Sequence, residues 1–252
     1  MADALGARRQ LAAAASAVIL ERRAVGRYSV TKKRKDVEKE IAARLRVRLA
    51  GDEGYERFNV APTQEVIAIV QDRHGRGARL LRWGLVPHWS TQPGSGLTMI
   101  NARAETLAHK PAYRNLVGRG SHRCLVVADG FYEWLRAEDP RQPRRPMRYS
   151  LAAGRSFCFA GLWTTWRGAD GRRVPSCTIL TTTANDLVTP LHDRMPVVLT
   201  DPRSWEAWLD PALDAEAVAP LLAPLPAAQM KVAPANPAMN SWEYEGPDCL
   251  VA

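Results

Sequence analysis

A glutamate between two aromatic residues is the first feature of this chain that points to proton chemistry. Glu133 stands between Tyr132 and Trp134, shortly after an apolar run over residues 124–128 that is typical of a β-strand. Apolar surroundings raise the pKa of a carboxyl group, and a general acid needs such a raised pKa near neutral pH. Glutamates of this kind are also common at the rim of a core, so Glu133 alone leaves both interpretations open.

A histidine in a proline-bounded loop is the second candidate for proton chemistry. His192 lies between Pro190 and Pro196, just ahead of an apolar run at residues 197–199. Prolines stiffen the backbone, so this loop could hold the imidazole ring toward a pocket. A loop histidine whose hydrogen bonds are satisfied locally is the alternative.

Two tryptophans flank a loop that is bent by glycine and proline. Trp83 and Trp89 stand at the two ends of this loop, which contains Gly84 and Pro87. Indole rings in such a loop suit either the filling of a core or a platform on which nucleic-acid bases stack. The composition of the loop does not decide between these two uses.

The elements that must position these residues are mainly β-strands. Apolar and β-branched runs separated by turn residues predict strands. A single α+β domain built on antiparallel strands, with peripheral helices, is the simplest arrangement that accommodates them. The expected strands are residues 26–30, 65–70, 78–83, 124–128, 149–151, 157–163 and 177–183.

Helices and less regular segments complete the prediction. Thr31 is expected to cap a helix that ends near Arg48, and another helix is expected to begin at Asp201. An exposed hairpin tip is expected at residues 136–145, and an extended segment at residues 227–252. Residues 1–24, rich in alanine and arginine, are expected to form a weakly ordered extension, which leaves a domain over residues 25–252.

The composition is that of a globular protein with a basic surface. The 252 residues include 35 Lys and Arg against 26 Asp and Glu, which gives a net charge of +9. This excess favours an acidic partner, either nucleic acid or an anionic membrane. No apolar run approaches the length of a membrane span. The four cysteines are widely spaced and form no C-x-x-C pair, so we expect buried free thiols and a cytoplasmic protein.

Six short motifs follow one another along the chain. They are Gly26-Arg27-Tyr28, Asn59-Val60-Ala61-Pro62, Arg82-Trp83-Gly84-Leu85-Val86-Pro87, Asn101-Ala102-Arg103-Ala104-Glu105-Thr106, Gly130-Phe131-Tyr132-Glu133-Trp134 and His192-Asp193-Arg194-Met195-Pro196-Val197. In this order they resemble the SOS-response-associated peptidase (SRAP) family, whose members shield abasic sites in single-stranded DNA. The resemblance runs from about Val25 to the C-terminus, and the combination makes a chance match improbable.

The resemblance implies a compact α+β fold with a barrel-like β core and a positively charged groove for single-stranded DNA. Family members expose a cysteine at the mature N-terminus, whose amine and thiol capture the sugar aldehyde of an abasic site as a thiazolidine. The amine attacks first and forms a Schiff base, because an α-amino pKa near roughly 8 leaves a neutral fraction at about pH 7. The implied activities are those of an abasic-site lyase and of a hydrolase that releases its own leader residues, without a metal or another cofactor.

By the same resemblance, three residues carry the chemistry. Asn101 would hold the amine or the sugar oxygen, Glu133 would shuttle protons during ring opening and imine formation, and His192 would protonate or deprotonate groups on the sugar. A carboxyl and an imidazole differ in resting pKa, so that one can accept a proton while the other donates near neutrality. A turn cap is the alternative role for Asn101.

The resemblance also implies a set of residues that contact DNA. Gly26 belongs to this set, and the arginines placed to meet phosphates would be Arg27, Arg103 and Arg194. Trp83 would stack on or wedge beside a base. The structural alternatives are salt-bridged arginines and an indole buried in the core.

A pocket for the abasic nucleotide is the last site that the resemblance implies. Asn59 and Pro62 would line this pocket, and an ordinary Asn/Pro turn is the structural alternative. The expected partner is therefore single-stranded DNA with abasic sites, bound by a monomer that is associated with the nucleoid in the cytoplasm.

The chain departs from the family at the nucleophile. The family pattern reads Met-Cys-Gly-Arg, whereas this chain reads Ala24-Val25-Gly26-Arg27. Valine has no thiol, so a thiazolidine cannot close, and with 24 residues upstream the nitrogen of Val25 is a peptide nitrogen. Three explanations compete: an amine freed at Val25 or Gly26 that forms a Schiff base without a lasting cross-link, non-covalent binding of damaged or single-stranded DNA, and a degenerate copy that keeps only the fold.

A basic binding or scaffold domain unrelated to DNA chemistry is the alternative of a different class. In that case Glu133 and His192 would be purely structural. The two classes differ in geometry, because the enzyme hypothesis requires Asn101, Glu133 and His192 to converge on one pocket next to Val25.

Overall fold

The computed structural model describes residues 25–48, 56–94, 99–135 and 142–252. The predicted extension, residues 1–24, lies outside the described residues, as does most of the predicted hairpin tip, residues 136–141. In the described part of the chain, no helix has the length and apolar character that crossing a membrane requires.

A closed barrel of five strands forms the centre of the molecule. Strand pairing runs in the order β10-β4-β3-β6-β9, and β9 pairs again with β10, which closes the barrel. All of these pairs are antiparallel except β10 with β4. The predicted α+β fold with a barrel-like, mainly antiparallel core is therefore confirmed. The strands are β3 (Glu65–Asp72), β4 (Gly75–Trp83), β6 (Arg123–Ala128), β9 (Phe157–Arg167) and β10 (Arg173–Thr183).

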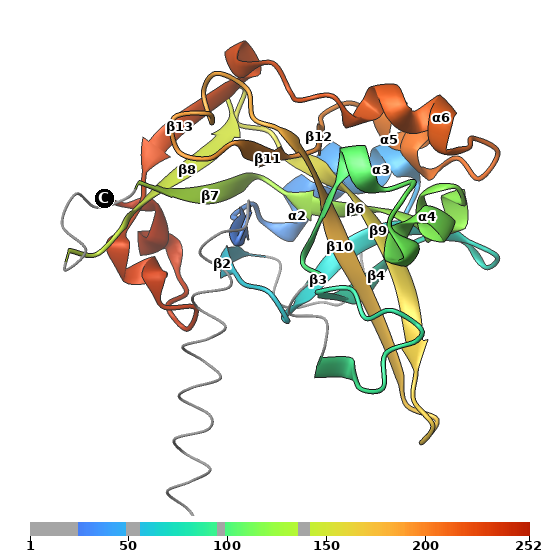
Figure 1. Ribbon diagram of the computed structural model, residues 1–252. Coiled ribbons are helices and arrows are strands. Elements are labelled where there is room, and N and C mark those ends of the chain that lie inside the picture. The colour runs from blue at the N-terminus through green and yellow to red at the C-terminus, as the bar shows by residue number, and fades with distance from the viewer. Residues whose placement is uncertain (1–24, 49–55, 95–98, 136–141) are drawn as a thin grey trace, which may run out of the picture.

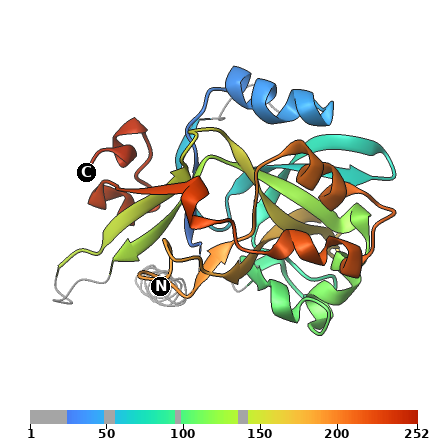
Figure 2. The same cartoon turned by 90° about the horizontal axis from the view of Figure 1, so that it is seen from above.

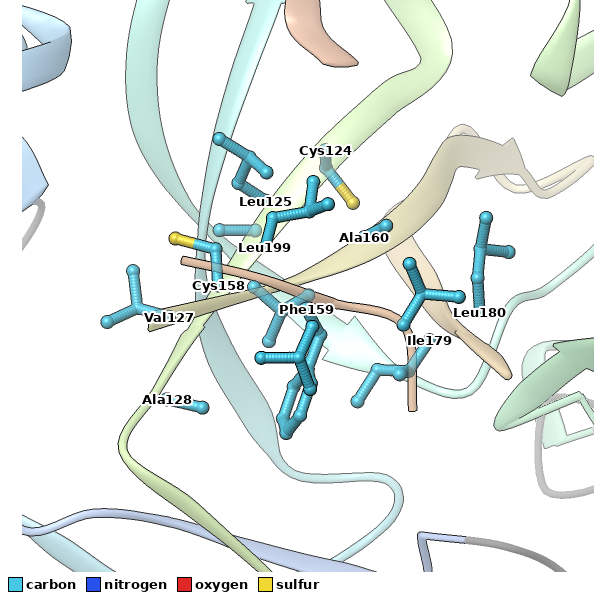
Figure 3. Close-up of a cluster of buried hydrophobic side chains, with 14 of the residues drawn as sticks. Cys124, Leu125, Val127, Ala128, Cys158, Phe159, Ala160, Ile179, Leu180 and Leu199 are labelled. Atoms are coloured by element: carbon cyan, nitrogen blue, oxygen red, sulfur yellow. The ribbon is translucent and has the colours of Figure 1, made fainter. Parts of the chain in front are cut away.

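Apolar side chains of the barrel strands form the main core. Every residue of β6 is buried, as is the first half of β9, so these strands are covered on both faces. Figure 3 shows part of this cluster, in which side chains of β6, β9 and β10 gather around Phe159. The four cysteines are free and buried, as the sequence predicted. Beyond this core, β9 and β10 continue as a long two-stranded ribbon (Figure 1).

A second sheet carries Glu133 and has the strand order β13-β8-β7-β1-β2. The chain enters it directly from the barrel, because only Asp129 separates β6 from β7. The strands of this sheet are β1 (Arg27–Val30), β2 (Arg57–Val60), β7 (Gly130–Leu135), β8 (Arg145–Leu151) and β13 (Met230–Pro234). The buried carboxylate of Asp129, just before β7, accepts hydrogen bonds from the Ser29 hydroxyl on β1 and from Arg148 on β8, both at 2.8 Å, and so connects these two strands.

The first helical segment differs from its prediction at both ends. It runs through α2 (Arg34–Val37), a π-helical turn (Glu38–Ala42) and α3 (Ala43–Leu45). Lys33, not Thr31, occupies the N-cap position, and the Thr31 hydroxyl donates to Asp129 at 2.7 Å instead. The segment ends before the predicted Arg48 because Arg46 adopts a left-handed conformation with φ of 55°.

The remaining helices gather at one end of the molecule, and the C-terminal segment lies at the other (Figure 2). The Asp201 side chain caps α5 as expected, by accepting from the backbone N–H groups of Arg203 and Ser204. The C-terminal segment, predicted to be extended, contains β13 and several 3₁₀ turns. The helices are α4 (Pro111–Val117), α5 (Pro202–Leu209) and α6 (Ala215–Val218); the short strands are β5 (Asn101–Arg103), β11 (Arg194–Pro196) and β12 (Val198–Leu199).

Candidate active site

The backbone of Val25 lies between two of the three residues that were predicted to carry the chemistry. Its N–H donates a hydrogen bond to Glu133 Oε1 at 2.8 Å. Its carbonyl oxygen accepts from Asn101 Nδ2 at 3.4 Å. Val25 itself is fully buried. The geometry therefore brings Asn101 and Glu133 together at Val25, the position where the family resemblance leads us to expect a cysteine.

Glu133 is buried for a different reason than its sequence neighbours indicate. In a β-strand successive side chains point to opposite faces, so Tyr132 and Trp134 do not share the face of Glu133. Tyr132 donates to Phe58 O at 2.8 Å and Trp134 donates to Asn240 Oδ1 at 2.6 Å, both in the C-terminal cluster on the other face. The prediction that Tyr132 and Trp134 form apolar walls around Glu133 is therefore wrong, because both side chains point to the opposite face of the strand.

The carboxyl group of Glu133 has the raised pKa that a general acid needs. The residue is only 4% exposed. Burial raises the pKa of Glu133 to about 8, and the negative charge of Asp193 also raises it, while the hydrogen bond from the Val25 N–H acts in the opposite direction. Glu133 is therefore protonated at neutral pH and able to donate a proton.

His192 lies in the loop that leads into β11, where the negative charge of its neighbour Asp193 acts on the pKa of Glu133. The ring nitrogen Nδ1 of His192 accepts from the Arg194 backbone N–H at 2.9 Å and lies 3.0 Å from Asp193 Oδ1. The loop thus fixes the orientation of the ring.

Val25 and Gly26 have an unusual local geometry. Val25 has a φ of 54°, a left-handed conformation that is strained for a β-branched residue. Gly26 is buried, yet a Cβ atom built on it would meet no described atom within 4 Å. Among the described residues, there is therefore open space beside the Gly26 backbone, next to the residue whose backbone binds Glu133 and Asn101.

Trp83 positions the strand that bears Asn101 and is not available to a base. Its indole is fully buried and packs edge-on against Tyr28, with ring centroids 5.4 Å apart. Its Nε1–H donates to the carbonyl of Ile100 at 2.9 Å, directly before Asn101. Base stacking by Trp83 is therefore corrected to a structural role, because both faces of the ring are covered. The exposed indole of this loop is Trp89, at 52%.

Arg27 has the environment of an anion-binding residue. Burial first, and then the positive charge of Arg144, lower the pKa of the Arg27 guanidinium to about 10. Among the described residues, its buried Nε has no hydrogen-bond partner. Two neighbouring cations near Val25 match the charge of a phosphate.

The other two predicted phosphate ligands differ from each other. Arg103, two residues after Asn101, is exposed to solvent. Arg194 instead forms a bidentate ion pair with Glu105, with both N–O distances at 2.8 Å, and donates to Thr181 O at 2.6 Å. These contacts indicate that Arg194 positions the His192 loop. They speak against the predicted contact between Arg194 and a phosphate.

Asn59 and Pro62 are buried and hold the fold. The amide Nδ2 of Asn59 donates to the carbonyls of Met239, Ser241 and Tyr244, at distances from 2.8 to 3.1 Å. The predicted lining of an abasic pocket by Asn59 is thus corrected, since its amide is used to attach the C-terminal segment to β2.

Sequence reasoning missed two residues that act on Glu133. Asp193 lies in the same motif as His192, and this position could have indicated that its charge acts on Glu133. Tyr149 lies on β8, and only the register between strands places it near Glu133. No local pattern could have indicated that second residue.

Comparison with known proteins agrees with this geometry. The fold is similar to that of a solved protein from Bacteroides thetaiotaomicron, with a TM-score of 0.74, 23% sequence identity, and 90% of this chain and 98% of the other covered. The barrel fold of this chain is therefore a known one. The family profile of the SOS response associated peptidases (SRAP) matches residues 25–242, and its match begins at Val25.

The chain belongs to the SRAP family. It is 41% identical over 194 residues to the abasic site processing protein YoqW of Bacillus subtilis, an alignment that covers 77% of this chain and 84% of that one. It is 28% identical over 203 residues to the abasic site processing protein HMCES of Xenopus tropicalis, with 72% and 59% covered.

Proposed function

We propose that this protein processes abasic sites in single-stranded DNA through an amine at Val25, without the lasting cross-link that a cysteine would allow. The observation that carries the proposal is the position of the Val25 nitrogen, 2.8 Å from Glu133 Oε1. Family membership and the names of the relatives supply the substrate class.

The nitrogen becomes a nucleophile only when the bond between Ala24 and Val25 is broken. A peptide nitrogen has no lone pair available for attack, whereas an α-amine with a pKa near roughly 8 is partly neutral at physiological pH. The strained φ of 54° at Val25 stores energy next to this bond, which favours its cleavage. The hydrolase activity that the family name indicates belongs to the same proposal.

The reaction of the freed amine requires the proton donor that lies next to it. The amine adds to the aldehyde carbon of the ring-opened sugar to give a carbinolamine, and loss of water leaves an imine. Protonated Glu133 supplies the proton that the departing hydroxyl takes. Removal of a proton from the adjacent sugar carbon then expels the 3′ phosphate and cleaves the strand, with His192 in the loop as the base.

Valine decides how the reaction ends. A thiol at this position would add to the imine and close a stable ring, but the valine side chain has no group that can do so. The imine is therefore hydrolysed, and the protein acts as a lyase that turns over. This proposal predicts strand cleavage with transient adducts.

The proposed DNA path runs over Arg27 and Arg103, with the exposed indole of Trp89 as a surface on which a base can stack. Non-covalent binding of single-stranded DNA is the second candidate function. It is favoured by the fact that Arg27 is equipped for an anion whether or not an amine is freed.

The test compares the full chain with a form that begins at Val25, each incubated with single-stranded DNA that carries one abasic site. The truncated form is expected to cleave the strand and to give an adduct after borohydride reduction, while the full chain does so only after its leader is released. The matched control is Glu133→Gln, for which we expect a rate reduced by about 100-fold or more with DNA binding kept. Binding without cleavage or adduct in the truncated form would leave only the non-covalent function.

A further inference from the structure

We propose that Tyr149 is a positioning residue of this site, whose phenol hydroxyl donates a hydrogen bond to the carboxylate of Glu133 when Glu133 has released its proton. This deepens the proposed function and rests on it for its consequence in catalysis. The contact itself is a property of the protein without DNA.

Strand register places the two side chains on one face of the sheet. Tyr149 lies opposite Phe131, and Glu133 lies opposite Met147. Residues two apart on a strand share a face, so Tyr149 and Glu133 are diagonal neighbours across β7 and β8, within reach of long side chains. The Tyr149 ring is stacked on Phe131, with centroids 5.1 Å apart and an interplanar angle of 13°, which fixes its direction.

The hydroxyl of Tyr149 lacks a partner of its own. The residue is fully buried, and among the described residues no group forms a hydrogen bond with this oxygen. A buried hydroxyl without a partner lowers the stability of the folded state by about 1–3 kcal/mol. Its place next to the Glu133 carboxyl therefore indicates a functional role. Burial, and second the charge of Glu133, raise the pKa of the Tyr149 phenol to about 12, which keeps it a donor at every pH of interest.

The Tyr149 donor is needed at the stage of the reaction when Glu133 has lost its proton. Glu133 is protonated before it acts and becomes a buried anion once the proton has left. An anion in such a site is costly unless a donor approaches it, and a phenol hydroxyl is a donor of suitable strength. Rotation of the Glu133 carboxyl toward Tyr149 satisfies both groups at once.

Two titratable groups of the described residues act on Glu133 besides its own burial. On β8 this group is Tyr149, and on the loop before β11 it is Asp193, whose neighbour in the chain is His192. The N–H of Val25 is a peptide donor in the full chain and does not titrate. Of the two titratable groups, Tyr149 is the one whose neutral form donates to a carboxylate.

The experiment measures the pKa of Glu133 directly, in the full chain without DNA, by NMR of carboxyl-labelled glutamate with Glu133→Gln for assignment. Tyr149→Phe is expected to raise this pKa by about 1 unit above its parent value, because the carboxylate loses a donor. The matched control is Tyr132→Phe, on the adjacent residue but the opposite face, whose hydroxyl is already bonded to Phe58 O. This control should leave the pKa of Glu133 unchanged and lower the stability.

The two variants should also differ in stability. Tyr149→Phe removes only a hydroxyl without a partner, so the folded state should be at least as stable as the parent. An unchanged pKa of Glu133 in Tyr149→Phe, or an equal shift in Tyr132→Phe, would overturn the inference. A raised pKa in a protein that neither binds nor cleaves abasic DNA would uphold the contact and refute the proposed function instead.

Discussion

At Val25 the backbone, and not the side chain, meets the acid–base residues. Asn101 and Glu133 bind its carbonyl and its N–H, so these contacts do not depend on which side chain residue 25 carries. A chain that had lost all chemistry would have no need to keep a buried carboxyl with a pKa of about 8 at this place. This arrangement separates capture by the amine from trapping by the thiol.

Glu133 makes the stability of the protein depend on pH. The pKa of a glutamate in the unfolded chain is about 4.3, and in the folded protein it is raised to about 8. The folded state therefore holds a proton that the unfolded state releases, and stability falls as the pH rises from about 4.3 through about 8. In Glu133→Gln this loss should disappear, which makes the variant more stable at pH 9 than the parent by on the order of 5 kcal/mol, relative to their difference at pH 4. Urea unfolding at both pH values measures the free energy of unfolding of the two proteins. If this free energy changed equally with pH in the parent and in Glu133→Gln, the raised pKa of Glu133 would be contradicted.

Restoring the thiol should restore the lasting cross-link. In the form that begins at residue 25, Val25→Cys supplies both the amine and the thiol, so we expect an adduct with abasic single-stranded DNA that survives heating without borohydride. The control is Val25→Ala, which has the amine alone and should give an adduct only after reduction. Denaturing gels measure both. Failure of Val25→Cys to cross-link would mean that the surroundings no longer support the reaction.

The sequence predicted that Asn101 and Glu133 lie together near Val25, because both stand in recognisable motifs. It failed for Trp83, whose burial is decided by the packing of Tyr28 and β5 around it. It also missed Tyr149, because a cross-strand neighbour depends on register and not on any local pattern. The residues most dependent on tertiary contacts were thus the hardest to predict.

At the scale of elements, the Asn59 side chain attaches the end of the C-terminal segment, beyond β13, to β2. Asn59 on β2 donates to three backbone carbonyls of that segment, and Glu245 in turn accepts from the Asn59 N–H at 3.1 Å. The same segment contacts Trp134 through Asn240. The segment therefore supports the face of β7 opposite Glu133.

Asn59→Ala should lower the free energy of unfolding by about 2–3 kcal/mol, because buried carbonyls lose their shared donor. Denaturant unfolding measures this loss. The matched control is Asn236→Ala, which removes a cap of a short 3₁₀ turn in the same segment and should cost about 1 kcal/mol or less. Equal losses in the two variants would show that Asn59 is not the principal attachment.

Strand positions followed well from the sequence, and the ends of the helices did not. Alternating and β-branched runs predict strands locally, whereas the cap expected from Thr31 was lost to a tertiary contact with Asp129. A cap forms only where the side chain has no better partner.

At the scale of the whole molecule, charge and fold class were both predictable. The net charge of +9 predicted an acidic partner without deciding between nucleic acid and a membrane, and strand-rich patterning predicted an antiparallel α+β domain. Closure of the barrel was expected only from the family resemblance, since the parallel pairing of β10 with β4 joins segments far apart in the chain. Such long-range pairing leaves no signature in a short window of sequence.

Binding of single-stranded DNA should weaken as salt rises, because bound phosphates release counterions. Arg27→Ala is expected to lower the slope of log affinity against log salt by about 0.7. The control is Lys33→Ala, on an exposed residue before α2, which should leave the slope unchanged. Fluorescence anisotropy at several salt concentrations measures both, and an equal effect of the two substitutions would contradict a DNA path over Arg27.

The most direct measurement locates the covalent bond. The form that begins at Val25 is incubated with abasic single-stranded DNA, reduced with borohydride, digested, and analysed by tandem mass spectrometry. The α-amine of Val25 is predicted to carry the reduced sugar remnant, and Glu133→Gln should sharply lower its yield. A remnant on lysine side chains, or none at all, would contradict the claim that Val25 supplies the nucleophile.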